Sequence, residues 1–65
     1  MDNEEINLSK KILSSYKERL ENEIIQRSIK LKISSKICEE IIENHNEINE
    51  LKKAIYELDN LKSRN

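Results

Sequence analysis

The sequence contains neither glycine nor proline, although average proteins have roughly 7% of the first and 5% of the second. Without these residues the tight turns of β-hairpins lack their favoured side chains, so a sheet of short hairpins is not expected. Phenylalanine and tryptophan are also absent, and the only aromatic residues are Tyr16 and Tyr56. We therefore predict an all-α protein whose core is built from isoleucine and leucine.

Groups that build an active site or a metal site are scarce. The single cysteine, Cys38, cannot form an internal disulfide, and no phosphate-binding loop exists without glycine. Cys38 and His45 are seven residues apart, so one helix face holds both. A structural zinc site needs four ligands, and a catalytic Cys–His pair needs a third, orienting group. We interpret both residues as part of a helix interface and expect no enzyme activity, catalytic residue, cofactor or metal.

Charged residues are abundant but balanced: they make up 38% of the chain, and the net charge is −1. This balance is unlike that of a polybasic nucleic-acid-binding tail or an acidic disordered tail. No apolar run approaches the roughly 20 residues of a membrane span, and the acidic first residues differ from the basic start of a signal peptide. We expect a cytoplasmic protein that has neither a membrane nor a nucleic acid as its partner.

Apolar residues recur at helical spacing in both halves of the chain. In the first half they repeat every seven residues, at Ile6, Leu13 and Leu20. The second half has two interleaved series, which is typical of the a and d positions of a coiled coil. The members of these two series are Ile41, Ile48 and Ile55, and Ile37, Leu51 and Leu58.

The helical pattern is weakest at residues 28–35, where apolar and polar residues alternate. Serine has mediocre helix propensity, and Ser34 or Ser35 is suited to cap a new helix. The pattern therefore predicts that one helix ends and another begins close to residue 34.

The distribution of charge favours a chain reversal at this break. Residues 10–36 carry eight basic and three acidic residues, whereas residues 37–50 carry five acidic residues and no lysine or arginine. Folding the chain near residue 34 lays these segments side by side. We predict a single domain over 1–65, an antiparallel helical hairpin with helices at about 3–31 and 36–62.

Two other arrangements also fit the sequence. Isoleucines spaced by four from Ile25 to Ile41 are compatible with one long helix in a coiled-coil dimer. Alternatively the turn lies at residues 43–46, because asparagine serves both as a helix C-cap and as an N-cap.

The apolar residues outnumber those that one seam between two helices can bury. Burying a leucine or isoleucine side chain is worth roughly 1.5–3 kcal/mol, so two hairpins that close into a four-helix bundle recover this free energy. We predict a homo-oligomer that acts as a small non-enzymatic regulator or adaptor by binding another protein. The predicted interface residues are Leu13, Leu20, Ile37, Ile41, Ile48, Leu51, Ile55 and Leu58.

The segment from Glu57 to Leu61, with sequence Glu-Leu-Asp-Asn-Leu, resembles the end of the Ser-Gln-x-Leu-Asp motif of the Spo0E-type aspartyl-phosphate phosphatases. Ile55 and Tyr56 stand where that motif has serine and glutamine. The resemblance implies a helical hairpin that dephosphorylates a response regulator, with Asp59 as the residue that carries the activity.

A second resemblance begins at Ile37-Cys38-Glu39 and continues at Ile41, Glu47 and Ile48. These residues are similar to the second helix of the Rop plasmid-copy regulator. That family implies a dimeric helical hairpin that binds paired RNA loops.

Overall fold

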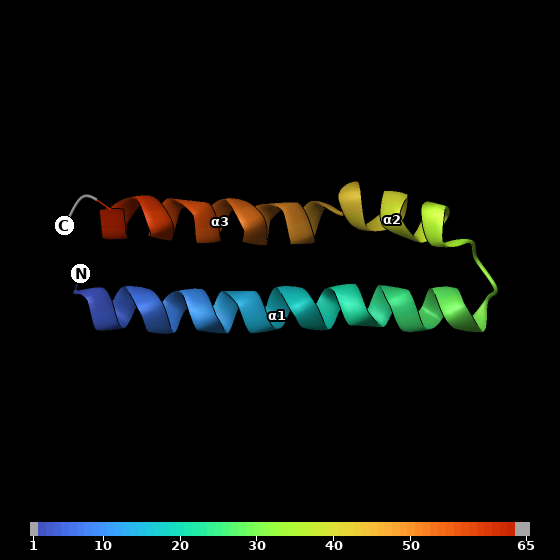
Figure 1. Ribbon diagram of the computed structural model, residues 1–65, viewed down its shortest axis with the longest axis horizontal. Coiled ribbons are helices and arrows are strands. Elements are labelled where there is room, and N and C mark those ends of the chain that lie inside the picture. The colour runs from blue at the N-terminus through green and yellow to red at the C-terminus, as the bar shows by residue number, and fades with distance from the viewer. Residues whose placement is uncertain (1, 64–65) are drawn as a thin grey trace.

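The computed structural model describes the backbone of residues 2–63 and the side chains of residues 2–61. Three helices make up this part of the chain, which has no strand: α1 (Asn3–Lys30), α2 (Ser35–Glu43) and α3 (Asn46–Ser63). Helix α1 runs antiparallel to α2 and α3, which follow one another along it, so the first and last described residues lie at the same end (Figure 1). The predicted all-α hairpin is confirmed in this outline.

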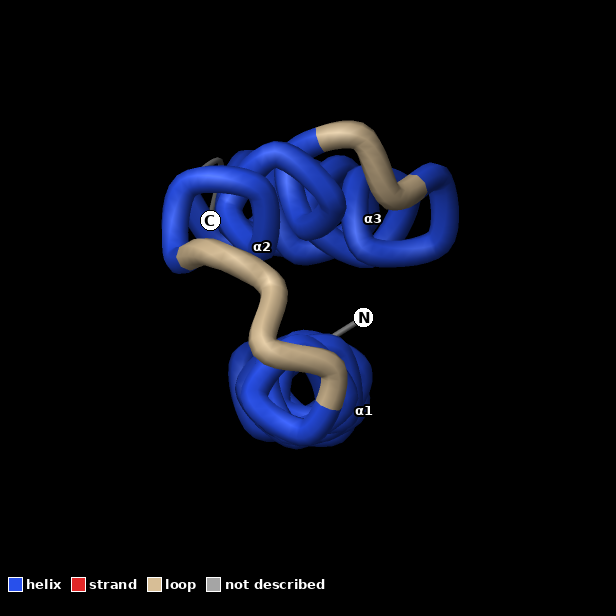
Figure 2. The backbone as a smooth tube through the Cα atoms, turned by 90° about the vertical axis from the view of Figure 1, so that its right-hand side faces the viewer, coloured by secondary structure: helices blue, strands red, loops and turns tan. Residues whose placement is uncertain are grey.

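The molecule is a rod of two layers. An end-on view shows α1 alone in one layer, with α2 and α3 together in the other (Figure 2). Its extents are 46 × 16 × 14 Å and its radius of gyration is 14.4 Å, against about 11 Å for a compact domain of this length. Because there are only two layers, one face of each helix has no helix of the same chain against it.

Helix α1 has favourable charges and caps at both ends. Its N-cap is Asp2, whose carboxylate accepts a hydrogen bond from the Glu5 backbone amide at 2.8 Å. Glu4 and Glu5 lie in the first turn and basic residues in the last, so the charges complement the helix dipole. These local signals explain why α1 starts close to the residue that the sequence predicts.

The chain leaves α1 through a Schellman motif built without glycine. The Ile33 amide donates to the Ser28 carbonyl at 2.9 Å, and the Lys32 amide donates to the Ile29 carbonyl at 3.2 Å. Lys32 takes the left-handed conformation at φ 57°, a position that glycine usually occupies. The two hydrogen bonds satisfy carbonyls at the end of α1. This offsets the free-energy cost of placing a residue with a Cβ atom in the left-handed conformation.

Helix α2 begins at the predicted cap. The Ser34 hydroxyl accepts from the Ile37 amide at 3.3 Å, so the chain reversal spans residues 31–34 as expected. A single continuous helix is therefore not the arrangement of this chain.

The sequence predicts one second helix at 36–62, whereas the structure divides this segment into α2 and α3. Helix α2 ends before Asn44, whose side-chain amide donates to the Glu40 carbonyl at 2.9 Å. The ring of His45 then accepts from the Ile48 amide at 3.2 Å, and Asn49 donates to the Glu43 carbonyl at 2.9 Å. These side chains satisfy the backbone groups that a helix break exposes, so the 43–46 segment bends the chain without reversing it.

The core lies along the seam between the two layers and is thin. Among the described residues its buried apolar side chains are Ile6, Cys38 and Ile48, with Ser28 as a buried polar neighbour. Helix α1 packs against both α3 and α2. Ile6 from α1 and Ile48 from α3 are the fully buried large side chains, so the hairpin depends heavily on few contacts.

We expect Ile48→Ala to lower the free energy of unfolding by about 2–5 kcal/mol, because it removes buried methyl groups and leaves a cavity in the seam. Urea denaturation followed by circular dichroism measures this change. The matched control is Ile29→Ala, since Ile29 is 64% exposed and its truncation should cost less than about 1 kcal/mol. Equal losses in both variants would contradict the position of the core.

We expect Lys32→Gly to raise the free energy of unfolding by about 1 kcal/mol, because glycine adopts a positive φ without a Cβ clash. Lys30→Gly is the control: it places glycine in a right-handed helical turn and should destabilise the chain by about 1 kcal/mol. Thermal or urea melts of the two variants should therefore shift in opposite directions. A shift in the same direction would contradict the Schellman geometry.

Candidate functional site

Six of the eight residues predicted to form the interface lie on the faces that meet within one hairpin. Ile48 is completely buried, and the other five are half-buried along the seam: Leu13, Leu20, Leu51, Ile55 and Leu58. Ile37 and Ile41 are instead exposed on α2. The seam thus uses most of the regular heptad pattern, and other apolar residues form the outer surface.

An exposed apolar stripe runs along the first half of α1. We define it as Leu8, Ile12 and Tyr16, which are 59%, 60% and 43% exposed. Their spacing of four places them in one row on the helix surface, beside the row of Ile6 and Leu13 that faces the seam. Heptad spacing does not indicate this stripe, because its members are four residues apart, whereas their spacing of four is itself a sequence signal for it.

The hydroxyl of Tyr16 connects this stripe to α3 through a hydrogen bond. It donates a hydrogen bond to the Glu47 carboxylate at 2.9 Å. This hydrogen bond, and then the negative charge of Glu47, raise the pKa of Tyr16 above the ordinary value of a tyrosine. The hydroxyl is therefore fixed while the ring stays partly exposed.

A second contact joins the same two helices nearer to their outer ends. Lys10 forms an ion pair with Asp59, whose side chain is about half exposed. Asp59 is the residue to which the phosphatase resemblance assigns activity, and here its carboxylate faces a lysine of α1. Both contacts connect residues far apart in the sequence, so they hold the two layers in register.

An apolar groove lies where α1 and α2 meet next to the turn. Its volume is about 320 Å³, and Cys38 and Ser28 are the buried members of its lining. We call it the turn-end groove and define it by Ile25, Ser28, Ile29, Ile33, Ser35, Cys38, Glu39 and Ile42. Four of these residues are isoleucines from both sides of the chain reversal, so the turn itself creates the groove.

Acidic side chains border this groove on α2. Glu39 is the charged residue of its lining, and Glu43 lies one helical turn further on the same face. Within the described side chains, no ion pair or hydrogen bond engages the carboxylates of Glu39, Glu40 or Glu43. Glu43 also occupies the last position of α2, where the helix dipole disfavours a negative charge, so a positively charged partner would stabilise this end.

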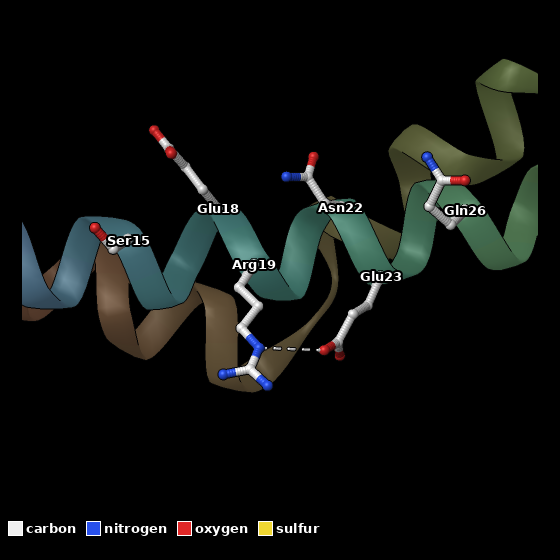
Figure 3. A pocket seen from close by; sticks show the side chains of 6 residues that line it. All are labelled: Ser15, Glu18, Arg19, Asn22, Glu23 and Gln26. Atoms are coloured by element: carbon white, nitrogen blue, oxygen red, sulfur yellow. Dashed lines mark ion pairs between the residues drawn. The ribbon is translucent and has the colours of Figure 1, made fainter.

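Another hollow on the surface is of a different kind. It lies on the outer face of α1, where six polar or charged side chains project into solvent from one helix (Figure 3). Arg19 and Glu23 within it form an exposed ion pair at 3.6 Å. Among the described residues its lining comes from α1 alone, so it resembles a solvated helix surface more than a binding site.

Cys38 and His45 do not share one helix face. The break after α2 separates them: the cysteine is buried within α2, whereas the imidazole caps the backbone of α3. No group of three potential metal ligands occurs among the described residues. In the same part of the chain, no helix combines the length and apolar character needed to cross a membrane.

We expect the hydrogen bond to Glu47 to make the ionisation of Tyr16 sensitive to one residue of α3. In a Tyr56→Phe background Tyr16 is the only tyrosine, so ultraviolet absorbance follows its titration alone. Glu47→Gln should lower the pKa of Tyr16 toward the ordinary tyrosine value, because it removes the negative acceptor.

The control for this titration is Glu50→Gln, which removes a carboxylate from the same helix but no contact with Tyr16. The raised pKa also has a consequence for stability. The contact contributes fully below the pKa of an unfolded tyrosine, and its contribution is lost as the pH rises through the higher folded pKa. An identical tyrosine titration with and without Glu47 would contradict the contact.

Comparison with known proteins places the chain in one family. No curated protein and no solved structure matches the sequence significantly. A family described as a domain of unknown function, DUF8630, matches residues 4–64, which include nearly all of the three helices. The chain therefore belongs to the DUF8630 family.

Proposed function

We propose that the protein is a small regulator or adaptor that acts by binding, forms a homo-oligomer, and docks on another protein through its helices. The observation that carries this proposal is the distribution of apolar side chains. Three are buried among the described residues, whereas ten large ones are exposed. Contiguous exposed apolar surface is typical of interaction sites.

The exposed area supports association with a second molecule. The chain exposes 5301 Å². A compact folded chain of the same mass exposes about 4,300 Å². The excess of roughly 1,000 Å² is comparable with the ~800 Å² that each partner buries in a standard interface.

The turn-end groove favours an amphipathic helix as the part of the partner protein that docks. Its isoleucines suit a row of apolar side chains, as in other complexes where a helix lies in a groove. The unpaired carboxylates of Glu39 and Glu43 suit lysine or arginine on the same helix. The proposed partner is thus a protein that presents a basic amphipathic helix.

We expect sedimentation equilibrium at micromolar concentration to give a mass of at least two chains. The reason is that a monomer would leave the exposed isoleucine, leucine and tyrosine side chains in water. A mass of one chain, together with a cooperative melt, would contradict the homo-oligomer.

We expect a synthetic helical peptide with leucine on one face and lysine on the other to bind the groove. Isothermal titration calorimetry measures the affinity. Ile29→Asn should weaken binding about tenfold, because it removes an apolar wall of the groove. The matched control is Ile12→Asn on the same helix outside the groove, which should leave the affinity unchanged.

The charge requirement has its own control. A peptide with glutamate in place of lysine should bind wild-type protein more weakly, and Glu39→Lys should reduce this difference. Equal binding of both peptides, or equal effects of the two asparagine substitutions, would contradict docking at the turn-end groove.

A further inference from the structure

Five exposed residues on α1 form a pattern that is symmetric about Ile12. They are Glu5, Leu8, Ile12, Tyr16 and Arg19, with successive spacings of three, four, four and three. At about 100° per residue they lie within roughly 80° of arc on one side of the helix. The apolar stripe therefore has a negative charge at one end and a positive charge at the other.

The order of spacings along α1 is the same when it is read in either direction. If a second α1 lies antiparallel across the first at Ile12, Leu8 faces Tyr16 of the other copy, and Ile12 faces its own counterpart. Glu5 then faces Arg19, and the same pair occurs twice because a two-fold interface uses each contact in both directions. Apolar side chains occupy the centre and opposite charges the rim, as in stable interfaces.

The five side chains are available for such a contact. The central isoleucine is 60% exposed, and the Glu5 carboxylate has no ion pair or hydrogen bond within the described side chains. Arg19 has 77% of its side chain exposed and meets only Glu23, at 3.6 Å, in a pair between neighbouring turns. Tyr16 uses its hydroxyl on Glu47, which holds the ring in place beside Ile12.

We infer that the occupant of the apolar stripe is a second copy of this chain, docked antiparallel on α1 with its two-fold axis at Ile12. The inference rests on the proposed homo-oligomer and specifies which surface forms it. Its basis is the complementary placement of charged and apolar residues within the pattern, together with the excess exposed area, which is sufficient for one interface per chain.

The position of the axis determines the shape of the dimer. Ile12 lies in the first half of α1, so the turn is about 27 Å away along the helix. The two turns then point in opposite directions, and each turn-end groove stays outside the dimer contact. The dimer therefore carries two separate grooves, one at each end.

Charge reversal tests the inference through two single variants. Glu5→Arg places arginine opposite Arg19 in both halves of the dimer, and Arg19→Glu places glutamate opposite Glu5. Each variant alone should raise the dimer dissociation constant about tenfold or more at low ionic strength, where exposed charges are least screened. Sedimentation velocity of each variant measures the loss.

Mixing these two variants in equal amounts should restore the dimer. In the mixed pair arginine at position 5 faces glutamate at position 19, and Arg19 faces Glu5, so both contacts are attractive. The dissociation constant of the mixture should return to within about threefold of the wild-type value. A merely destabilised α1 would not be rescued in this way, and circular dichroism confirms that each variant remains helical.

Ile12→Asp and Ile29→Asp form the matched pair for the apolar centre. Both residues are exposed to a similar degree on α1, at 60% and 64%. Ile12→Asp should give a monomer, whereas Ile29→Asp should leave the dimer intact. If Ile29→Asp dissociates the dimer instead, the second copy occupies the turn-end groove and the inference is overturned.

Two further outcomes separate the inference from the proposed function. If wild-type protein is an oligomer that none of these substitutions weakens, the stripe is not the interface, and the homo-oligomer stands. If wild-type protein is a monomer at micromolar concentration, both the inference and the proposed homo-oligomer fail.

Discussion

The structure depends on the contact along a single seam between α1 and the layer formed by α2 and α3. Two layers of helix can bury only one row of side chains from each, and in this hairpin the row includes Ile6 and Ile48. Glycine and proline are missing and the only aromatics are two tyrosines, so no bulky ring thickens the core. The remaining apolar residues must therefore lie on the outside of the rod, where they form the stripe and the groove.

Polar contacts determine how the two layers align. The hydrogen bond from Tyr16 to Glu47 and the ion pair between Lys10 and Asp59 both connect α1 with α3. An exposed ion pair is worth about 0–1 kcal/mol, so the apolar seam, and not these polar contacts, supplies the stability. Their main effect is on register, and the register decides which apolar residues the outer surface presents.

The two breaks in the second half of the chain have different consequences. At residues 31–34 the Schellman motif and the Ser34 cap reverse the chain and bring isoleucines of α1 and α2 together around a groove. At residues 44–45 asparagine and histidine side chains satisfy the exposed backbone groups, and α3 continues along α1. The long α1–α3 seam is therefore separate from the groove next to the turn.

The sequence by itself determined the all-α class, the reversal near residue 34 and the cap at Ser34. These features depend on residues close together in the chain: the absence of glycine, the apolar periodicity and side chains that reach the nearest free amides. The segment at residues 43–46 is compatible by sequence with a reversal as well as with a bend, because asparagine caps occur in both.

Only the tertiary structure decided which apolar residues are buried and which are exposed. Heptad spacing grouped Ile37 and Ile41 with Ile48, yet the first two are exposed and the third is buried. Spacing defines a row on one helix, whereas burial depends on where the other layer lies against that row. The bend between α2 and α3 changes which side of each helix faces α1. Residue spacing along the chain does not reveal this orientation.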